Sequence, residues 1–170
     1  MQMQYKKFLF LALLCWNVYA ADGVNVSVTG NIVASPCVFN GGNSNLDVNL
    51  GNIQAINMAT PGSTSDPVTF NFVFTHCPVG TRTVTASFTG TPDPVAGADY
   101  YMNSGSATNV AVAMRERASG ILKGTGSSIS QNIAADRTAT MPMQALVKSV
   151  SGGVAPGSIS AVVMVTLQYN

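Results

Sequence analysis

The residues best able to do chemistry in this chain are two cysteines, Cys37 and Cys77, and the histidine that precedes the second, His76. A third cysteine, Cys15, lies in an N-terminal leader that we expect to be removed. Two cysteines left in an exported chain predict one disulfide. In the chain-entropy model, closing a loop of this length stabilises the fold by about 4 kcal/mol.

Catalytic or metal chemistry is not indicated by the remaining polar residues. One histidine beside one cysteine, with no acidic cluster nearby, does not match a metal site. The chain has a single His, and its seven acidic residues lie mostly in turn-like contexts. No phosphate-binding loop, nucleophile elbow or paired-carboxylate motif is present. We therefore predict no catalytic residue, no metal site and no cofactor, and we interpret His76 as a surface residue beside the disulfide.

Two further groups admit a functional interpretation beside a structural one. Arg115-Glu116-Arg117 could be a recognition patch, but a solvated strand end is the favoured interpretation. Tyr100 and Tyr101 could stack on a sugar, but we expect loop aromatics that pack over the domain.

Residues 1–20 have the features of a secretory signal peptide. Lys6 and Lys7 form the positive region, and the apolar stretch from Phe8 to Trp16 is shorter than the roughly 20 residues of a membrane span. Small residues before Ala21 fit a cleavage site. The predicted destination is outside the cytoplasm, and a retained N-terminal anchor is the alternative.

Composition limits the partners of the exported chain. Removing the leader leaves one domain of ordinary size, and without the leader lysines the formal charge changes from +1 to −1. This balance predicts no nucleic-acid partner and no anionic membrane surface. Charged residues make up only 9% of the chain, a composition that suits a protein whose surfaces are covered by copies of itself or by partners.

The C-terminal segment is the clearest strand. Every second residue is apolar from Ile159 onward, which predicts a β-strand with one committed face. Val162 and Met164 add apolar character to the second face, so we expect this strand to be central in its sheet.

The rest of the exported chain predicts several short strands. Alternating apolar residues begin at Val24, Leu46, Val68, Val84, Val110 and Met141, whereas residues 91–97 and 124–130 are expected to be loops. Gly, Pro, Ser, Thr and Asn punctuate these runs, and no sustained helical period is present. The expected architecture is an all-β sandwich.

Four features together resemble the pilins of chaperone–usher fimbriae. The first is the alternating N-terminal segment from Val24 to Ile32 with its glycine, Gly30. The second is the pair Cys37 and Cys77, the latter within Thr75-His76-Cys77-Pro78-Val79-Gly80-Thr81. The third is the run from Val84 to Gly90, and the fourth is the C-terminal strand with Tyr169 penultimate. The resemblance covers the whole exported chain and is strongest to the minor tip-fibrillum adaptor subunits of type 1 fimbriae.

The resemblance implies an immunoglobulin-like sandwich that lacks its final strand and is completed in trans by donor-strand complementation. It implies a signal peptide at 1–20, a donor-strand extension at 21–33 and a pilin domain at 34–170. The donor residues would be Val24, Val26, Val28, Gly30 and Ile32. The acceptor groove would be edged by Gly157, Ile159, Ala161, Val163, Val165, Leu167 and Tyr169.

The implied function is that of a structural subunit of an adhesive fimbria, exported through the periplasm to the cell surface. Its implied partners are a periplasmic chaperone, an outer-membrane usher, neighbouring pilins and the tip adhesin, with no small-molecule substrate. A major rod pilin is the alternative position in the fibre. A small outer-membrane β-barrel is the alternative of another class, although the strands are short and aromatics make up only 8%.

Overall fold

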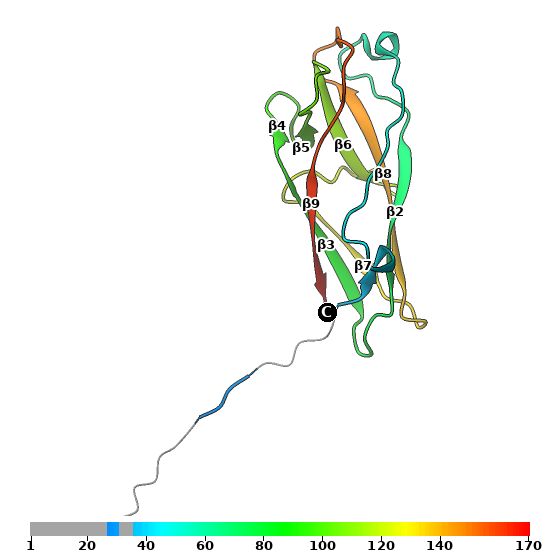
Figure 1. Cartoon of the computed structure of the whole chain (residues 1–170), viewed down its shortest axis with the longest axis vertical. Coiled ribbons are helices and arrows are strands. Elements are labelled where there is room, and N and C mark those ends of the chain that lie inside the picture. Colours follow the sequence, from blue (N-terminus) through cyan, green and yellow to red (C-terminus); the bar gives the residue numbers. More distant parts are fainter. Residues whose placement is uncertain (1–26, 31–35) are drawn as a thin grey trace, which may run out of the picture. The chain divides into compact units, whose positions relative to one another are not determined.

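The computed structural model describes residues 27–30 and 36–170. The predicted signal peptide and the predicted donor residues Val24, Val26 and Ile32 lie outside the described residues. The domain from Pro36 to Asn170 consists of two packed antiparallel sheets (Figure 1).

The larger sheet has six strands in the order β1-β2-β8-β6-β5-β4, and the smaller has three in the order β7-β3-β9. The strands of the larger sheet are β1 (Val38–Phe39), β2 (Val68–Thr75), β8 (Ala139–Ser149), β6 (Val110–Glu116), β5 (Gly97–Met102) and β4 (Pro92–Asp93). Those of the smaller sheet are β7 (Ser128–Asn132), β3 (Thr83–Gly90) and β9 (Val163–Tyr169).

The long strands form where the apolar residues alternate. Along β3, for example, the apolar Val84, Ala86 and Phe88 are fully buried, whereas Ser87 between the last two is exposed. On this strand the alternation gives one face for the core and one for solvent. On β6, by contrast, the residues from Val110 to Met114 are all buried. The strands predicted near residues 68, 84, 110 and 141 are therefore present as β2, β3, β6 and β8.

Two segments predicted as loops contain strands instead. The predicted loop at 91–97 holds β4 and leads into β5, and the predicted loop at 124–130 overlaps β7. Neither region has an alternation of apolar residues that would predict a strand. β4 pairs with β5, which itself pairs with β6, and β7 pairs with β3.

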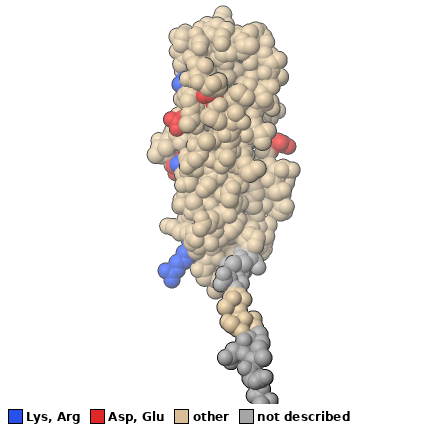
Figure 2. Space-filling view, turned by 90° about the vertical axis from the view of Figure 1, so that its left-hand side faces the viewer, with Lys and Arg blue, Asp and Glu red and all other residues tan. Residues whose placement is uncertain are grey.

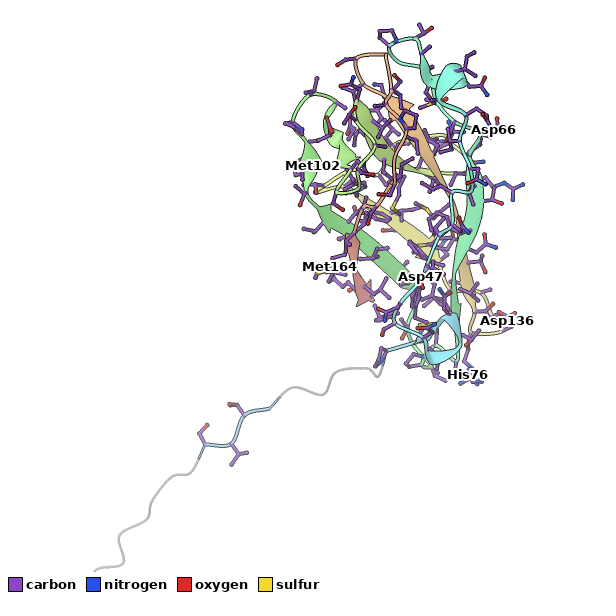
Figure 3. The ribbon with its side chains drawn as sticks, turned by 45° about the horizontal axis from the view of Figure 1, so that its top comes forward. Asp47, Asp66, His76, Met102, Asp136 and Met164 are labelled. Atoms are coloured by element: carbon purple, nitrogen blue, oxygen red, sulfur yellow. A yellow bond between two sulfur atoms is a disulfide. The ribbon has the colours of Figure 1, made fainter. Side chains whose placement is uncertain are left out.

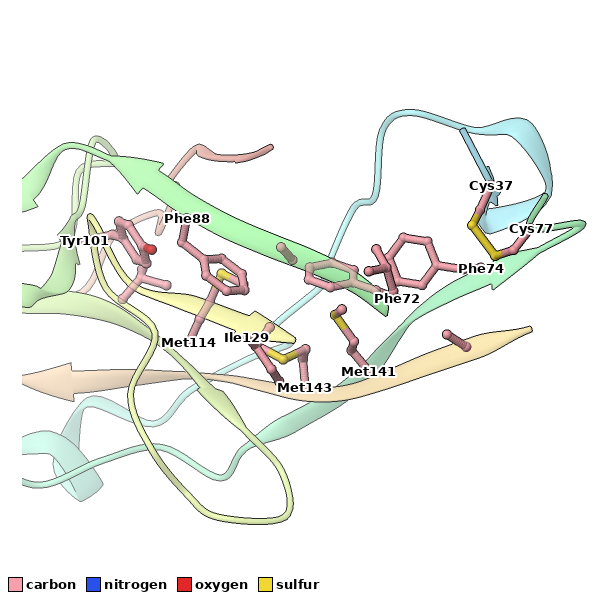
Figure 4. Close-up of a cluster of buried hydrophobic side chains, with 14 residues drawn as sticks. Cys37, Phe72, Phe74, Cys77, Phe88, Tyr101, Met114, Ile129, Met141 and Met143 are labelled. Atoms are coloured by element: carbon pink, nitrogen blue, oxygen red, sulfur yellow. A yellow bond between two sulfur atoms is a disulfide. The ribbon is translucent and has the colours of Figure 1, made fainter. Parts of the chain in front are cut away.

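Aromatic and sulfur-containing side chains fill the space between the sheets. The buried cluster in Figure 4 includes Phe72 and Phe74 from β2, Phe88 from β3 and Met141 and Met143 from β8. The rings of Phe72 and Phe88 lie 6.3 Å apart between centroids, so the two sheets are in direct contact here. A second, smaller cluster forms around Met58 and Val147.

In the part of the chain that the structure describes, helical structure is limited to two short 3-10 turns, η1 (Asn40–Gly42) and η2 (Ala55–Met58). Within the described ranges, no helix is long or apolar enough to cross a membrane. The all-β sandwich expected from the sequence is thus confirmed.

Candidate strand-binding groove

A groove of about 1310 Å³ runs between β9 and the segment that follows Cys37. One side is formed by β9 and the residues just before it, and the other by residues 43–55. Phe70 and Phe72 of β2 and Val112 and Met114 of β6 contribute to the lining. The groove therefore opens directly onto the core between the two sheets.

The backbone of β9 has one free edge toward this groove. Thr83 and Asn170 exchange both backbone hydrogen bonds, at 2.9 and 3.0 Å, and such pairs alternate along an antiparallel ladder. The N–H and C=O groups of Val163, Val165, Leu167 and Tyr169 therefore point away from β3. Within the described part of the chain, β3 is the one strand paired with β9.

The side chains of the same four residues face the groove. Each is half-buried, whereas Met164, Thr166 and Gln168 between them are exposed. The edge of β9 thus combines unpaired backbone groups with a row of apolar side chains. Edges of this kind are templates for another strand.

Two expectations about this strand are corrected. It was expected to be central because Val162 and Met164 are apolar, but β9 is an edge strand. Val162, just before β9, is 82% exposed, and Met164 on β9 (Figure 3) is 68% exposed. The strand was also expected to begin at Ile159, but β9 begins at Val163. Ahead of it, Ser160 is held partly by a side chain, since its N–H donates to Asn103 Oδ1 at 2.8 Å.

The residues before β9 continue the groove in phase with it. Ser158 and Ser160 accept backbone hydrogen bonds from Ala107 and Ser104, at 3.0 and 2.8 Å. Ile159 and Ala161 alternate with them and pack, half-buried, against the core. All seven residues predicted from Gly157 to Tyr169 line the same groove.

Gly157 has a second, purely steric role. A Cβ at this position would clash with the backbone of Ser106 and Ala107, and one at Gly105 would clash with the backbone of Ser158. The two glycines let the backbones of residues 104–107 and 157–160 lie side by side in close contact.

The opposite side of the groove was not recognised as part of the site. Leu46, Val48 and Leu50 alternate and were expected to form an ordinary strand, but residues 43–54 contain no assigned strand. These three side chains line the groove, with Leu46 39% exposed and the others half-buried. A strand needs a ladder partner, and this segment faces β9 across the groove.

The groove carries little charge. Asp47 is its one charged lining residue among those described, and Asp47 is exposed. Figure 2 shows how sparse charged side chains are on one face of the molecule. At one end of the groove, the Tyr169 ring packs edge-on against Phe74, and burial raises the pKa of its hydroxyl. The groove therefore suits an uncharged ligand.

The disulfide predicted from the cysteine count is present beside this end of the groove. Cys37 and Cys77 are bonded, with their Cα atoms 4.2 Å apart. His76 is exposed, as expected, and has a left-handed backbone with φ of 53° (Figure 3). No group of three His, Cys, Asp or Glu side chains arranged to hold a metal occurs in the residues that the structure describes.

The remaining candidate residues have structural contacts. Tyr101 is on β5, buried, and donates a hydrogen bond to the Lys123 carbonyl at 2.7 Å. Tyr100 has the Lys148 ammonium 4.2 Å from its ring centre. Arg115 lies near the end of β6 and donates to Gln144 Oε1 at 2.8 Å.

The structure describes only two of the five predicted donor residues. Val28 and Gly30 belong to the short described segment 27–30, which has no assigned strand, and Val28 is 88% exposed. A side-chain atom at Gly30 would meet no other atom within 4 Å.

Comparisons with known proteins agree with one another. The family model described as "Fimbrial protein" matches residues 26–170. Protein FimG of Escherichia coli K12 is 32% identical over 94% of this chain and 92% of its own length. The fimbrial-like protein YdeR of the same strain is 34% identical over 97% of both chains. The solved P pilus rod subunit PapA superposes with a TM-score of 0.66 at 21% identity, over 80% of this chain and all of that one.

Proposed function

This chain belongs to the fimbrial protein family, and on that premise we propose that its groove binds the N-terminal extension of a neighbouring subunit in the fibre. Its family is one of structural subunits of chaperone–usher pili, which are exported through the periplasm to the cell surface. Its fold is an immunoglobulin-like sandwich that lacks a strand.

The observation that carries the proposal is the free edge of β9. Its unpaired backbone groups and its apolar side chains belong to the same residues and face one groove of about 1310 Å³. An inserted strand would satisfy the backbone edge and cover the apolar row at once. Leu46, Val48 and Leu50 would then lie on the other side of that strand.

An N-terminal extension like residues 21–33 of this chain would fit the groove of a neighbouring subunit. Val24, Val26, Val28 and Ile32 would present their side chains to the groove of a neighbour, and Gly30 would lie at a shallow point. Burial of four aliphatic side chains at about 1.5–3 kcal/mol each is favourable by roughly 6–12 kcal/mol before ordering costs. The bond between subunits should therefore dissociate very slowly.

A periplasmic chaperone and an outer-membrane usher complete the proposed pathway. An apolar groove with a free strand edge is prone to aggregation, so a subunit needs a temporary strand before its neighbour arrives. We place the subunit near the tip, as a minor adaptor, because the segment Cys77-Pro78-Val79-Gly80-Thr81 resembles adaptor subunits. The likeness to a rod subunit at 21% identity bears on the fold alone.

Thermal unfolding of two proteins tests the proposal. One is the chain from Ala21 to Asn170, and the other has residues 23–33 moved to follow Asn170 through a short flexible linker. A large rise in the unfolding midpoint of the second protein, as a clean monomer, is expected because the added segment fills the groove. A chain that is already a stable monomer and gains nothing would show that the sandwich is complete.

Gly30→Leu gives the matched test of assembly. Its side chain should block insertion of the extension into a neighbour while leaving the pilin domain folded. Normal polymerisation of this variant in a reconstituted usher reaction would contradict the role of Gly30.

A further inference from the structure

We propose that Lys123 closes a second free strand edge of this domain, on β7, so that strand addition is confined to the groove beside β9. This inference rests on the proposed function, because it explains why one edge of the small sheet accepts a strand and the other does not.

The small sheet ends in two edge strands, β9 on one side of β3 and β7 on the other. Ile133 N–H, just after β7, donates to the Arg82 carbonyl at 2.8 Å, so the backbone of Ile133 faces β3. Every second residue of an antiparallel strand faces the same neighbour. The backbone groups of Ser128, Ser130 and Asn132 therefore point away from β3, where the described chain places no further strand.

The Lys123 ammonium lies against this second edge. Its Nζ donates a hydrogen bond to the Ser128 carbonyl at 3.1 Å and lies 4.0 Å from Glu116 Oε2. The Lys123 side chain is only 10% exposed, and a lysine is rarely so buried unless it is paired. The cation therefore occupies a backbone acceptor that an added strand would need.

Lys123 reaches β7 from the opposite sheet. Its backbone N–H donates to the Met114 carbonyl of β6 at 2.8 Å, and its carbonyl accepts a hydrogen bond from the Tyr101 hydroxyl at 2.7 Å. The residue thus bridges the two sheets beside β7, with its backbone bonded to the large sheet and its ammonium to the small one.

The free backbone that remains on β7 is short. With the Ser128 carbonyl occupied, Ser130 and Asn132 are the residues of β7 that keep both outward backbone groups free among the described residues. Strands in proteins are usually at least about three residues long, so this edge gives an added strand little to pair with. The free edge of β9, from Val163 to Tyr169, is longer.

Charge separates the two edges as clearly as length. A strand added to β7 would displace the Lys123 ammonium from the Ser128 carbonyl and desolvate a cation. Inward-pointing charges, and lysines above all, are a general means of blocking strand pairing at a sheet edge. The described lining of the groove beside β9 includes no lysine or arginine, so that edge has no such block.

Self-association of a groove-filled chain tests this inference. The protein is the chain in which residues 23–33 follow Asn170, so that the β9 edge is covered and no free extension remains. With Lys123 in place it should be a monomer. Lys123→Met keeps an apolar side chain of similar length but removes the charge. The molecular mass of this variant in static light scattering should rise about twofold or more, since pairing of two β7 edges joins two copies.

Lys148→Met is the matched control, because Lys148 is the other lysine of residues 21–170 and contacts the Tyr100 ring, away from β7. This variant should stay monomeric. Ser130→Pro, added to Lys123→Met, should restore the monomer, because the Ser130 N–H points away from β3 and its loss breaks no bond to that strand. A folded Lys123→Met variant that stays monomeric, or an association that persists with Ser130→Pro, would overturn the inference.

Lys123→Gln covers the case in which the Met variant does not fold, and the same rise in mass is expected because the amide carries no charge. Loss of cooperative unfolding in both variants would mean that Lys123 is needed for the fold itself, contrary to the inference. Failure of the proposed function has a separate signature. The groove-filled chain with Lys123 intact would then unfold at the same midpoint as the chain 21–170, whatever the mass of the variants.

Discussion

At the scale of single residues, two glycines without side chains allow close backbone and ring contacts near the groove. Gly157 has no side chain, and the backbone of Ser106 and Ala107 occupies the space where one would be. Tyr101 packs over another such position, since a Cβ at Gly90 would lie 2.7 Å from its ring. These contacts hold the residues before β9, and with them one end of the groove, in place.

Gly157→Ala should destabilise the domain by about 1–3 kcal/mol, the usual cost of overpacking a tight contact. The atoms that must move are backbone, which cannot turn aside as a flexible side chain can. Chemical denaturation of the purified chain measures the loss. Gly30→Ala is the matched control, because a Cβ there meets nothing within 4 Å. Equal stability of the two variants would refute the crowding at Gly157.

Because of Tyr101, the free energy of unfolding should depend on pH in the alkaline range. Burial raises the pKa of its hydroxyl from 10.0 to about 12, so the folded state keeps a proton that the unfolded state releases. The stabilisation is fully present below pH 10 and is lost as the pH rises toward 12. Tyr101→Phe should flatten this part of the pH–stability curve. It should also cost about 1 kcal/mol near neutral pH through the lost hydrogen bond to Lys123. An unchanged alkaline slope in the variant would contradict this assignment.

At the scale of elements, β9 has two faces and two edges with different roles. One edge pairs with β3, and the other is free toward the groove. The inward side chains of Val163, Val165 and Leu167 line the groove, whereas those of Met164 and Thr166 face outward. The same charged substitution at an inward residue and at the adjacent outward residue can therefore distinguish an effect on strand binding from a general effect of the charge.

Val165→Asp should weaken binding of a peptide of residues 23–33 by a hundredfold or more, because insertion would bury an unpaired carboxylate at a cost of several kcal/mol. Met164→Asp should change that affinity little, since its side chain is 68% exposed and faces away from the groove. Fluorescence titration of the labelled peptide gives both values. Similar losses for the two variants would show that the peptide does not bind along the inward face.

At the scale of the whole molecule, two unequal sheets leave a gap that the domain cannot fill with its described residues. The larger sheet has six strands and the smaller has three. The disulfide joins Cys37, at the start of the described domain, to Cys77, just after the end of β2 and beside the open groove. Because β1 has only two residues, this covalent bond carries much of the attachment of the segment that forms the second side.

Replacing both cysteines, Cys37→Ser with Cys77→Ser, should lower the free energy of unfolding by about 4 kcal/mol on the chain-entropy model. Both side chains are buried, so the introduced hydroxyls add a further desolvation cost. Urea unfolding of the variant, with the reduced and the oxidised natural chain as controls, measures the two contributions. Equal stability of the oxidised and reduced natural chain would contradict a stabilising role for the bond.

Alternating apolar residues were enough to predict β2, β3 and β8, because a period of two is typical of a strand with one buried and one exposed face. The same pattern predicted β6, although its residues from Val110 to Met114 are all buried. The inward row from Ile159 to Tyr169 and the disulfide could also be predicted from the sequence. The resemblance to pilins, together with this row, was enough to predict a groove beside the last strand.

Which strand edges are paired depends on the fold. β5 and β7 lack an alternation of apolar residues, and each is a strand because it pairs with the edge of a neighbouring strand, β6 and β3 respectively. Leu46, Val48 and Leu50 alternate but form no strand, because their backbone has no partner in the described chain. Met164 is apolar yet exposed on an edge strand. A residue's type indicates only whether its side chain favours burial, whereas strand pairing depends on a second segment, distant in sequence, that must lie beside it.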